Sequence, residues 1–281
     1  MPEPREARLA VLIDSDNTSA SHAGDLLEEV AKYGVPTVKR AYGDWTTQQL
    51  VGWKAELHRH AIQPVQQFAY TTGKNSTDSA LIIDAMDLLY SGNLDAFAIV
   101  SSDSDFTRLA TRLRESGATV YGLGRRRTPE SFRAACNRFI YLEVLGATEE
   151  DQQESDDREA PPLPDLRKLM TKAIDSTSQD DGWSSLSAVG SYLGNSHASF
   201  DPRNYGFPKL SSLAKAQDYL EVKQGENGAA PRVRLKPKPA RKQATKKSEP
   251  KQAETKPVDT KPVVTRTTRR RSTAKKAASQ P

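Results

Sequence analysis

Cysteine is nearly absent from the sequence, and this shortage limits the kinds of site that the protein can carry. Cys136 is the single cysteine among 281 residues, so an internal disulfide and a cysteine-rich zinc site are both excluded. The 4 histidines are scattered along the chain, and we interpret them as surface or packing residues. Any site must therefore be built from other side chains.

Long apolar runs are missing as well. No stretch approaches the ~18 apolar residues that a membrane-spanning helix needs. The N-terminal residues MPEPREAR lack the apolar core of a signal peptide and lead directly into a predicted strand. We therefore expect a cytoplasmic protein that does not bind a membrane.

Acidic residues are scarce at the C-terminal end of the chain. Residues 236–281 contain 15 Lys and Arg but only 3 Asp and Glu, and too few apolar residues to fold alone. The preceding residues hold 26 Lys and Arg against 33 Asp and Glu. A mildly acidic body followed by a disordered basic tail indicates a polyanionic partner, although such a tail can also serve only to increase solubility.

Strand and helix patterns alternate through the first half of the chain. This alternation predicts an α/β domain, residues 1–146, with a parallel sheet and helices on both faces. The predicted strands are 8–14, 35–42, 63–69, 95–102, 118–124 and 139–145. The predicted helices are 19–34, 46–60, 76–92, 105–117 and 128–136.

A second, smaller module follows an acidic, proline-containing linker at residues 147–165. Three helical patterns, at 166–176, 182–194 and 207–217, precede a predicted strand pair at 218–224 and 231–236. Three helices and a two-stranded ribbon within residues 166–235 predict a winged helix-turn-helix.

Four carboxylates follow strands or open a helix in the α/β domain. Asp14 ends the first predicted strand, Asp103 and Asp105 follow the fourth, and Asp78 opens the third helix. Ligands of open parallel sheets bind beyond the carboxyl ends of the strands, where the strand order reverses. A strand order of 3-2-1-4-5 places this reversal between the first and fourth strands. All four side chains could then reach one crevice.

A cluster of carboxylates needs a cation to offset the repulsion between its members. Oxygen ligands without histidine or cysteine select Mg²⁺ or Mn²⁺, which can activate water and polarise a phosphodiester. Helix capping is the alternative role for any single one of these residues. Asp16, Asp44, Asp84 and Asp87 are weaker candidates, and Asp84 could hydrogen-bond to neighbouring backbone instead.

Three motifs carry a family resemblance: LIDSDN from Leu12, KNSTDSALIIDAMDL from Lys74 and IVSSDSDF from Ile99. Their order and spacing resemble the NYN domain family, in its LabA-like branch, which is related to the PIN nucleases. The resemblance covers about residues 8–145. It implies a ribonuclease that uses Asp14, Asp78, Asp103 and Asp105, with Asn17 as the polar partner after the first strand.

The second module resembles the OST-HTH (LOTUS) domain, a winged helix associated with RNA binding. The stretch RNYGFPKLSSLAKAQDYLEV, residues 203–222, carries most of this resemblance. Basic and aromatic residues of both modules are candidates for contact with nucleic acid. These candidates are Lys74, Arg125, Arg126, Arg127, Arg203, Tyr205, Lys209 and Lys215.

The sequence thus favours a metal-dependent ribonuclease that cleaves RNA with Mg²⁺ or Mn²⁺. Two alternatives stay open at this point. One is a non-catalytic RNA-binding regulator with a vestigial acidic crevice. The other is a DNA-directed nuclease or DNA-binding factor, because a tail rich in Lys and Arg also suits duplex DNA.

Overall fold

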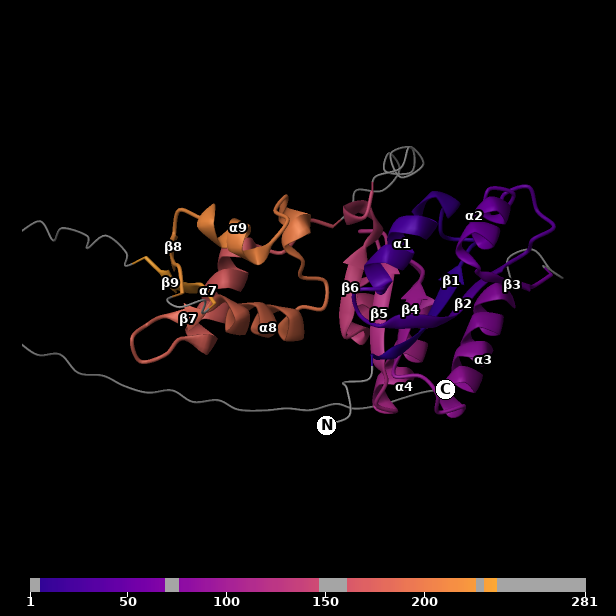
Figure 1. The fold of residues 1–281 in the computed structure, drawn as a ribbon, viewed down its shortest axis with the longest axis horizontal. Coiled ribbons are helices and arrows are strands. Elements are labelled where there is room, and N and C mark those ends of the chain that lie inside the picture. Colours follow the sequence, from indigo (N-terminus) through magenta and orange to yellow (C-terminus); the bar gives the residue numbers. More distant parts are fainter. Residues whose placement is uncertain (1–5, 69–75, 147–160, 226–229, 237–281) are drawn as a thin grey trace, which may run out of the picture. The chain divides into compact units, whose positions relative to one another are not determined.

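The computed structural model describes residues 6–68, 76–146, 161–225 and 230–236 (Figure 1). Lys74 and the tail from residue 237 onward lie outside the described residues, as does most of the predicted linker. The described residues form an α/β domain that reaches Gly146, and a small helical domain that begins after Pro164.

A six-stranded parallel sheet with the order β3-β2-β1-β4-β5-β6 is the frame of the α/β domain. The predicted order of the first five strands is confirmed, and the last strand extends the sheet beyond β5. The order reverses between β1 and β4, where Ile13 pairs with Val100. The strands are β1 (Arg8–Asp14), β2 (Val35–Gly43), β3 (Gln63–Gln66), β4 (Ala96–Val100), β5 (Thr119–Gly124) and β6 (Arg138–Tyr141).

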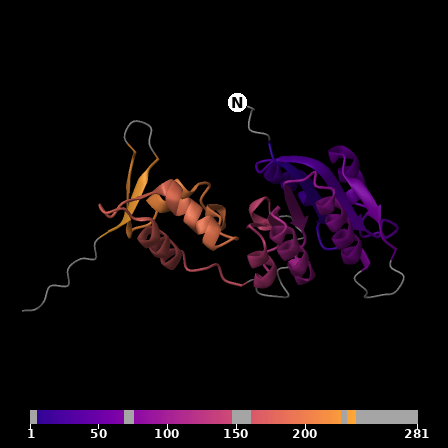
Figure 2. The ribbon, with the colours of Figure 1, turned by 90° about the horizontal axis from the view of Figure 1, so that it is seen from below.

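Helices cover both faces of this sheet (Figures 1 and 2). Successive side chains of a strand point to opposite faces. Leu9, Val11 and Ile13 of β1 therefore pack with α1 and α2, whereas Ala10 and Leu12 pack with α3, α4 and α5. The helices are α1 (Ala23–Val30), α2 (Trp53–His60), α3 (Ser76–Tyr90), α4 (Thr107–Glu115) and α5 (Glu130–Ala135).

The second helix begins later than its sequence pattern predicts. Helix α2 starts at Trp53, whereas the pattern indicated a helix from residue 46. The Asp44 carboxylate accepts hydrogen bonds from the Thr46 backbone N–H (3.1 Å) and from the Gln66 side chain (2.9 Å). This carboxylate holds the chain in turns after β2. Residues 46–52, which the pattern assigned to the helix, are therefore unavailable for it.

The helical domain has its own apolar core, which includes Met170, Leu193, Leu213 and Val233. The predicted helices and the antiparallel strand pair are confirmed, and a short strand adds a third member to the sheet, in the order β7-β9-β8. These elements are α7 (Leu166–Thr177), β7 (Ser184–Ser185), α8 (Leu186–Ser196), α9 (Leu210–Lys215), β8 (Leu220–Lys223) and β9 (Arg232–Leu235).

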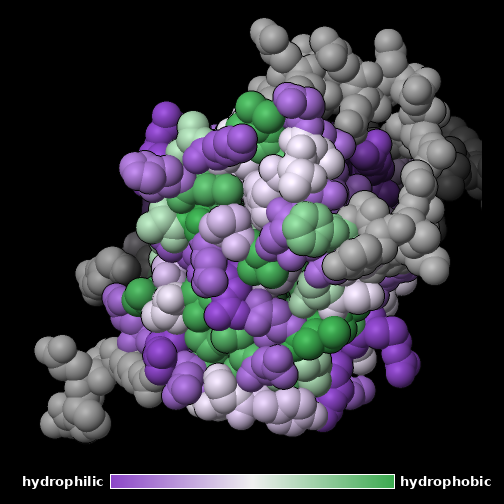
Figure 3. All heavy atoms as spheres, turned by 90° about the vertical axis from the view of Figure 1, so that its right-hand side faces the viewer, coloured by the Kyte–Doolittle hydropathy of each residue, from purple (hydrophilic) through white to green (hydrophobic). Residues whose placement is uncertain are grey.

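Apolar side chains also reach the surface of the α/β domain. Val51, Phe68, Ile83 and Tyr90 are exposed large hydrophobic residues. Figure 3 shows one face of the molecule, on which hydrophobic residues are interspersed with hydrophilic ones. Among the helices of the described ranges, none has the length and apolar character needed to cross a membrane.

Candidate metal centre

Asp14 lies buried at the carboxyl end of β1, at the reversal of strand order. Its Oδ2 atom accepts hydrogen bonds from the Ser101 hydroxyl (2.7 Å) and from the Asn17 side-chain amide (2.9 Å). Its Oδ1 atom is buried and has no hydrogen-bond partner among the described residues. Burial raises the pKa of the Asp14 carboxyl above its ordinary value, although both hydrogen bonds oppose the shift.

Three other carboxylates form the closest acidic cluster of the described residues. Each of Asp78, Asp103 and Asp105 offers an oxygen that lies within 4.8 Å of the oxygens from the other two. Asp78 comes from the first turn of α3, and the other two flank Ser104 at the 3-10 helix η2 (Ser104–Phe106), which follows β4. Asp14 is not a member of this set, so the predicted four-residue cluster is a close trio beside a buried carboxylate.

Helix capping and metal binding are compatible at Asp103. Its Oδ1 atom accepts a hydrogen bond from the Asp105 backbone N–H at 2.9 Å, which caps η2. A cap of this kind uses one carboxylate oxygen and leaves the second for another ligand. Asp103, not Asp105, therefore has the capping role, and this role does not remove Asp103 from the trio.

Asp16, one of the weaker candidates from the sequence, lies close to the centre. Its Oδ2 atom accepts a hydrogen bond from the Thr77 hydroxyl at 2.8 Å, which ties the loop after β1 to the start of α3. Asp16 also contributes to the raised pKa values of Asp14 and Asp78. The motif LIDSDN held the signal for Asp16, but nothing in the sequence indicated its contact with Thr77.

Helix α3 is held to β2 by a polar cluster behind the site. The Asp84 carboxylate accepts hydrogen bonds from the side chains of Arg40 and Tyr42. Asp84 of α3 thus bonds to side chains of β2, and not to the neighbouring backbone that the sequence suggested. Because Asp78 lies on the same helix, this cluster helps to fix the position of its carboxylate.

Negative charge accumulates at Asp78. Burial, followed by the charges of Asp14, Asp103 and Asp105, raises the pKa of the Asp78 carboxyl to about 6. A cation in the trio would remove this repulsion, because it binds the charged form of each carboxylate. The all-oxygen donor set and the unpartnered Oδ1 atom of Asp14 both fit a hard divalent cation.

A pH-dependent stability follows for the metal-free protein. The folded pKa of Asp78, about 6, lies above its ordinary value of 3.8. The folded state then binds more protons than the unfolded state between these values, so stability falls as pH rises through this window. We expect Asp78→Asn to match the wild type at pH 4 and to exceed its Tm by about 3–6 °C at pH 7 in EDTA. Thermal denaturation of both proteins at several pH values measures this difference, and a constant difference across the window would contradict it.

The arginine run after β5 lies at the same edge of the sheet. Arg125 is buried and its backbone N–H donates to the Ser102 hydroxyl at 2.9 Å, while the Arg126 backbone N–H donates to the Glu143 carboxylate at 2.7 Å. The side chain of Arg127 is exposed and lines the same hollow as Asp103. Arg127 is therefore the best placed of the three for contact with a phosphate near the trio.

The predicted nucleic-acid residues of the helical domain differ in their surroundings. Arg203 donates hydrogen bonds to the carboxylates of Glu29 and Asp201, each at 2.8 Å, so its guanidinium has protein partners. The Tyr205 hydroxyl donates to the Pro164 carbonyl (2.9 Å), and its ring packs with Phe200. The remaining candidates are exposed: Lys209 and Lys215.

The described structure combines a parallel α/β domain, acidic at the carboxyl edge of its sheet, with a small helical domain. Residues 8–143 match the NYN domain, and residues 161–230 match the OST-HTH/LOTUS domain. The chain therefore carries an NYN domain, of the PIN-like nuclease class, followed by an OST-HTH/LOTUS domain, as the sequence motifs predicted. This pair of domains fits a ribonuclease role.

Several solved structures are similar to parts of the chain. A protein of unknown function from Vibrio parahaemolyticus is 15% identical with a TM-score of 0.44, and the match covers 50% of this chain and 96% of that one. A Chromobacterium violaceum protein segment is 37% identical, with a TM-score of 0.24 and coverages of 30% and 95%. An uncharacterized Nitrosomonas europaea protein is 33% identical, with a TM-score of 0.24 and coverages of 31% and 93%. No curated protein matches the chain.

Proposed function

We propose that this protein is a metal-dependent ribonuclease that hydrolyses RNA phosphodiester bonds. The observation that carries the proposal is the carboxylate trio of Asp78, Asp103 and Asp105, with oxygens within 4.8 Å of one another at the edge where the strand order reverses. Three negative charges at this separation are unfavourable without a cation. Their convergence from two separate local elements, α3 and η2, is the arrangement expected of a metal-dependent site.

Mg²⁺ or Mn²⁺ is the proposed cation. Asp78, Asp103 and Asp105 would hold it directly or through water, and the Oδ1 atom of Asp14 would accept a hydrogen bond from one of these waters. Such a cation polarises the phosphodiester and helps to deprotonate water. Ser101 and Asn17 keep the other oxygen of Asp14 in place, so they act by positioning that carboxylate.

Contacts with RNA are proposed for both domains. Arg127, and Arg125 beside it, would bind phosphates close to the trio. The OST-HTH/LOTUS domain would hold RNA away from the reacting bond, with the exposed Lys209 and Lys215 as phosphate contacts. Lys74 stays a proposed phosphate contact on the sequence alone.

The metal dependence gives the direct test of this function. We expect the purified protein to cut labelled single-stranded RNA with Mn²⁺ or Mg²⁺, and EDTA to lower the rate by at least about 10³-fold. Addition of either cation in excess of EDTA should restore cleavage, because the carboxylates are unchanged by the chelator. Gel analysis of initial rates measures both steps. Cleavage that continues unchanged in EDTA would overturn the proposed mechanism.

The same assay distinguishes the proposed ribonuclease from the two alternatives, a non-catalytic RNA-binding regulator and a DNA-directed nuclease. Tight RNA binding without cleavage under either metal would indicate the non-catalytic regulator. Cleavage of DNA in preference to RNA of the same sequence would indicate the DNA-directed nuclease. The three substrates are therefore single-stranded RNA, duplex RNA and DNA, each tested at equal concentration.

A further inference from the structure

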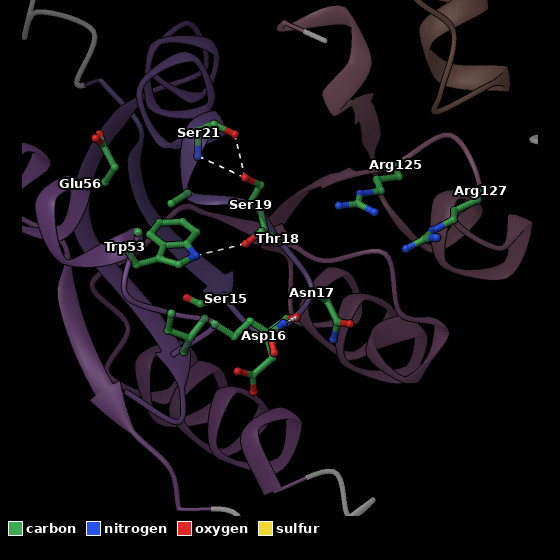
Figure 4. A pocket seen from close by; sticks show the side chains of 14 residues that line it. Ser15, Asp16, Asn17, Thr18, Ser19, Ser21, Trp53, Glu56, Arg125 and Arg127 are labelled. Atoms are coloured by element: carbon green, nitrogen blue, oxygen red, sulfur yellow. Dashed lines mark hydrogen bonds between the residues drawn. The ribbon is translucent and has the colours of Figure 1, made fainter. Parts of the chain in front are cut away.

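A pocket of about 570 Å³ lies beside the candidate metal centre (Figure 4). Its walls come from three segments: the loop after β1, the start of α2 and the arginine loop after β5. This volume is in the range of about 300–1,000 Å³ that is usual for small-molecule sites. The residues that the argument below uses are Asn17, Thr18, Gln49, Gly52, Trp53 and Arg127.

This pocket continues toward the carboxylate trio. A second hollow, of about 360 Å³, is lined by Asp103 of the trio and shares Asn17 and Arg127 with the pocket. Asn17 donates a hydrogen bond to Asp14, so one of the shared residues is already part of the centre. A single polynucleotide strand could therefore pass from the trio, past Arg127, into the pocket.

Charged and polar groups are separated along the pocket. Arg125 and Arg127 lie on one side, and Trp53 and Glu56 lie on the opposite side (Figure 4). Asn17 and Gln49 add polar side chains to its lining. The side-chain amide of Gln49 donates a hydrogen bond to the Asp16 carbonyl (3.2 Å), and its side-chain oxygen remains an acceptor. The pocket therefore offers cations for a phosphate and a polar lining for a sugar or base.

We propose that this pocket binds the nucleotide next to the scissile phosphate. The phosphate of that nucleotide would contact Arg127, and its sugar and base would occupy the space between Thr18, Gln49 and Gly52. A base can enter such a pocket only when it is unpaired and unstacked. The pocket would thus make the proposed nuclease selective for single-stranded RNA, and in this sense the inference rests on the proposed function.

Gly52 allows the pocket to be filled without a change at the metal centre. A Cβ atom at this position would meet only the Ala20 side chain, at 3.8 Å, and the backbone has a helical φ of −59°. Gly52→Leu should therefore fold and place its side chain within the pocket. Gly194→Leu is the matched control, because a Cβ atom there has nothing within 4 Å and the residue lies on α8 of the other domain.

Trp53 supplies a signal that reports on the pocket alone. Its indole N–H donates to the Thr18 carbonyl at 3.1 Å, and the chain has only 3 tryptophans. In EDTA, we expect 5′- and 3′-ribonucleoside monophosphates at millimolar concentration to shift this indole resonance in the wild type and in Gly194→Leu. Gly52→Leu should lose the shift while the Trp45 and Trp183 resonances keep their positions. No shift in the wild type, or an equal shift in Gly52→Leu, would overturn the proposal.

Cleavage kinetics of a variant on the cationic side of the pocket give a second readout. Arg127 is exposed, so Arg127→Gln should fold and should raise KM for single-stranded RNA about tenfold with a smaller change in kcat. A change in kcat alone would contradict a role in binding. Because the monophosphate titration contains no metal, it separates the two proposals. Binding without any RNA cleavage would refute the nuclease and keep the pocket, whereas cleavage without binding would refute only the pocket.

Discussion

Asp103→Asn is expected to lower the rate of RNA cleavage by about 10³-fold. The substitution removes one charge from the trio and replaces an oxygen of the proposed metal site with an amide nitrogen. Asparagine caps a helix about as well as aspartate, so the hydrogen bond from the Asp105 backbone N–H should persist. The measurement is the initial rate of cleavage of labelled single-stranded RNA at saturating Mn²⁺.

Thermal stability distinguishes a metal ligand from a structural residue. Without metal, Asp103→Asn should melt at the same temperature as the wild type or higher, because repulsion with Asp78 is removed. Asp87→Asn is the matched control, since Asp87 is an exposed carboxylate of α3 outside the trio. It should cut RNA at the wild-type rate. A different outcome would assign Asp103 to capping alone: Asp103→Asn unfolds, and the fraction that stays folded cleaves RNA at the wild-type rate.

Local patterns were sufficient to predict the sheet. The apolar run AFAIV of β4 is buried along its whole length, as expected for a central parallel strand with helices on both faces. Strict alternation of strands and helices then leaves few topologies, and the order with its reversal between β1 and β4 is confirmed. This reversal brings the end of β1 beside the end of β4, where Ser101 bonds to Asp14.

The details of the centre depend on contacts that local patterns do not encode. Thr77 and Asp16 are 61 residues apart, and Arg40 and Asp84 are 44 residues apart, yet each pair forms a hydrogen bond. Asp14 lies outside the close trio because Ser101 and Asn17 bind one of its oxygens beneath the surface. Such side-chain choices depend on tertiary packing, which hydrophobic periodicity does not specify.

The sequence could not show which basic residues are available to bind RNA, because carboxylates of the protein compete with phosphates for them. The sequence marks Arg203 as a cation near a predicted recognition helix, but the carboxylates of Glu29 and Asp201 occupy its guanidinium. Burial acts to raise the pKa of Glu29, but hydrogen bonds from Arg203, Lys32 and Tyr33 outweigh it and lower the pKa to about 2. An arginine held this firmly is a poor phosphate ligand, because RNA would have to displace two carboxylates. Lys209, by contrast, has an exposed side chain, so its ammonium group is accessible to a phosphate.

Deletion of residues 237–281 is expected to weaken RNA binding by about 10²-fold or more at low salt. The segment from Lys236 onward carries 15 Lys and Arg against 3 Asp and Glu, whereas the preceding residues are acidic overall. Each phosphate that a cation neutralises releases counterions, so the logarithm of the binding constant falls by ~0.7 per contact for each logarithmic unit of salt on single strands. The deletion should therefore also flatten the salt dependence. Fluorescence anisotropy with labelled RNA at several salt concentrations measures both effects.

A charge variant of the full-length chain separates the effect of the tail's charge on RNA binding from the effect of its length. Substitution of the arginines in the tail by glutamine should give an affinity and a salt slope between those of the wild type and the deletion. These arginines are Arg241, Arg266, Arg269, Arg270 and Arg271. Because the carboxylate trio lies within residues 1–146, the deletion should raise KM for RNA more than it lowers kcat. Equal salt slopes for the wild type and the deletion would show that the tail makes no phosphate contacts, and the exposed lysines of the second domain would then account for RNA affinity.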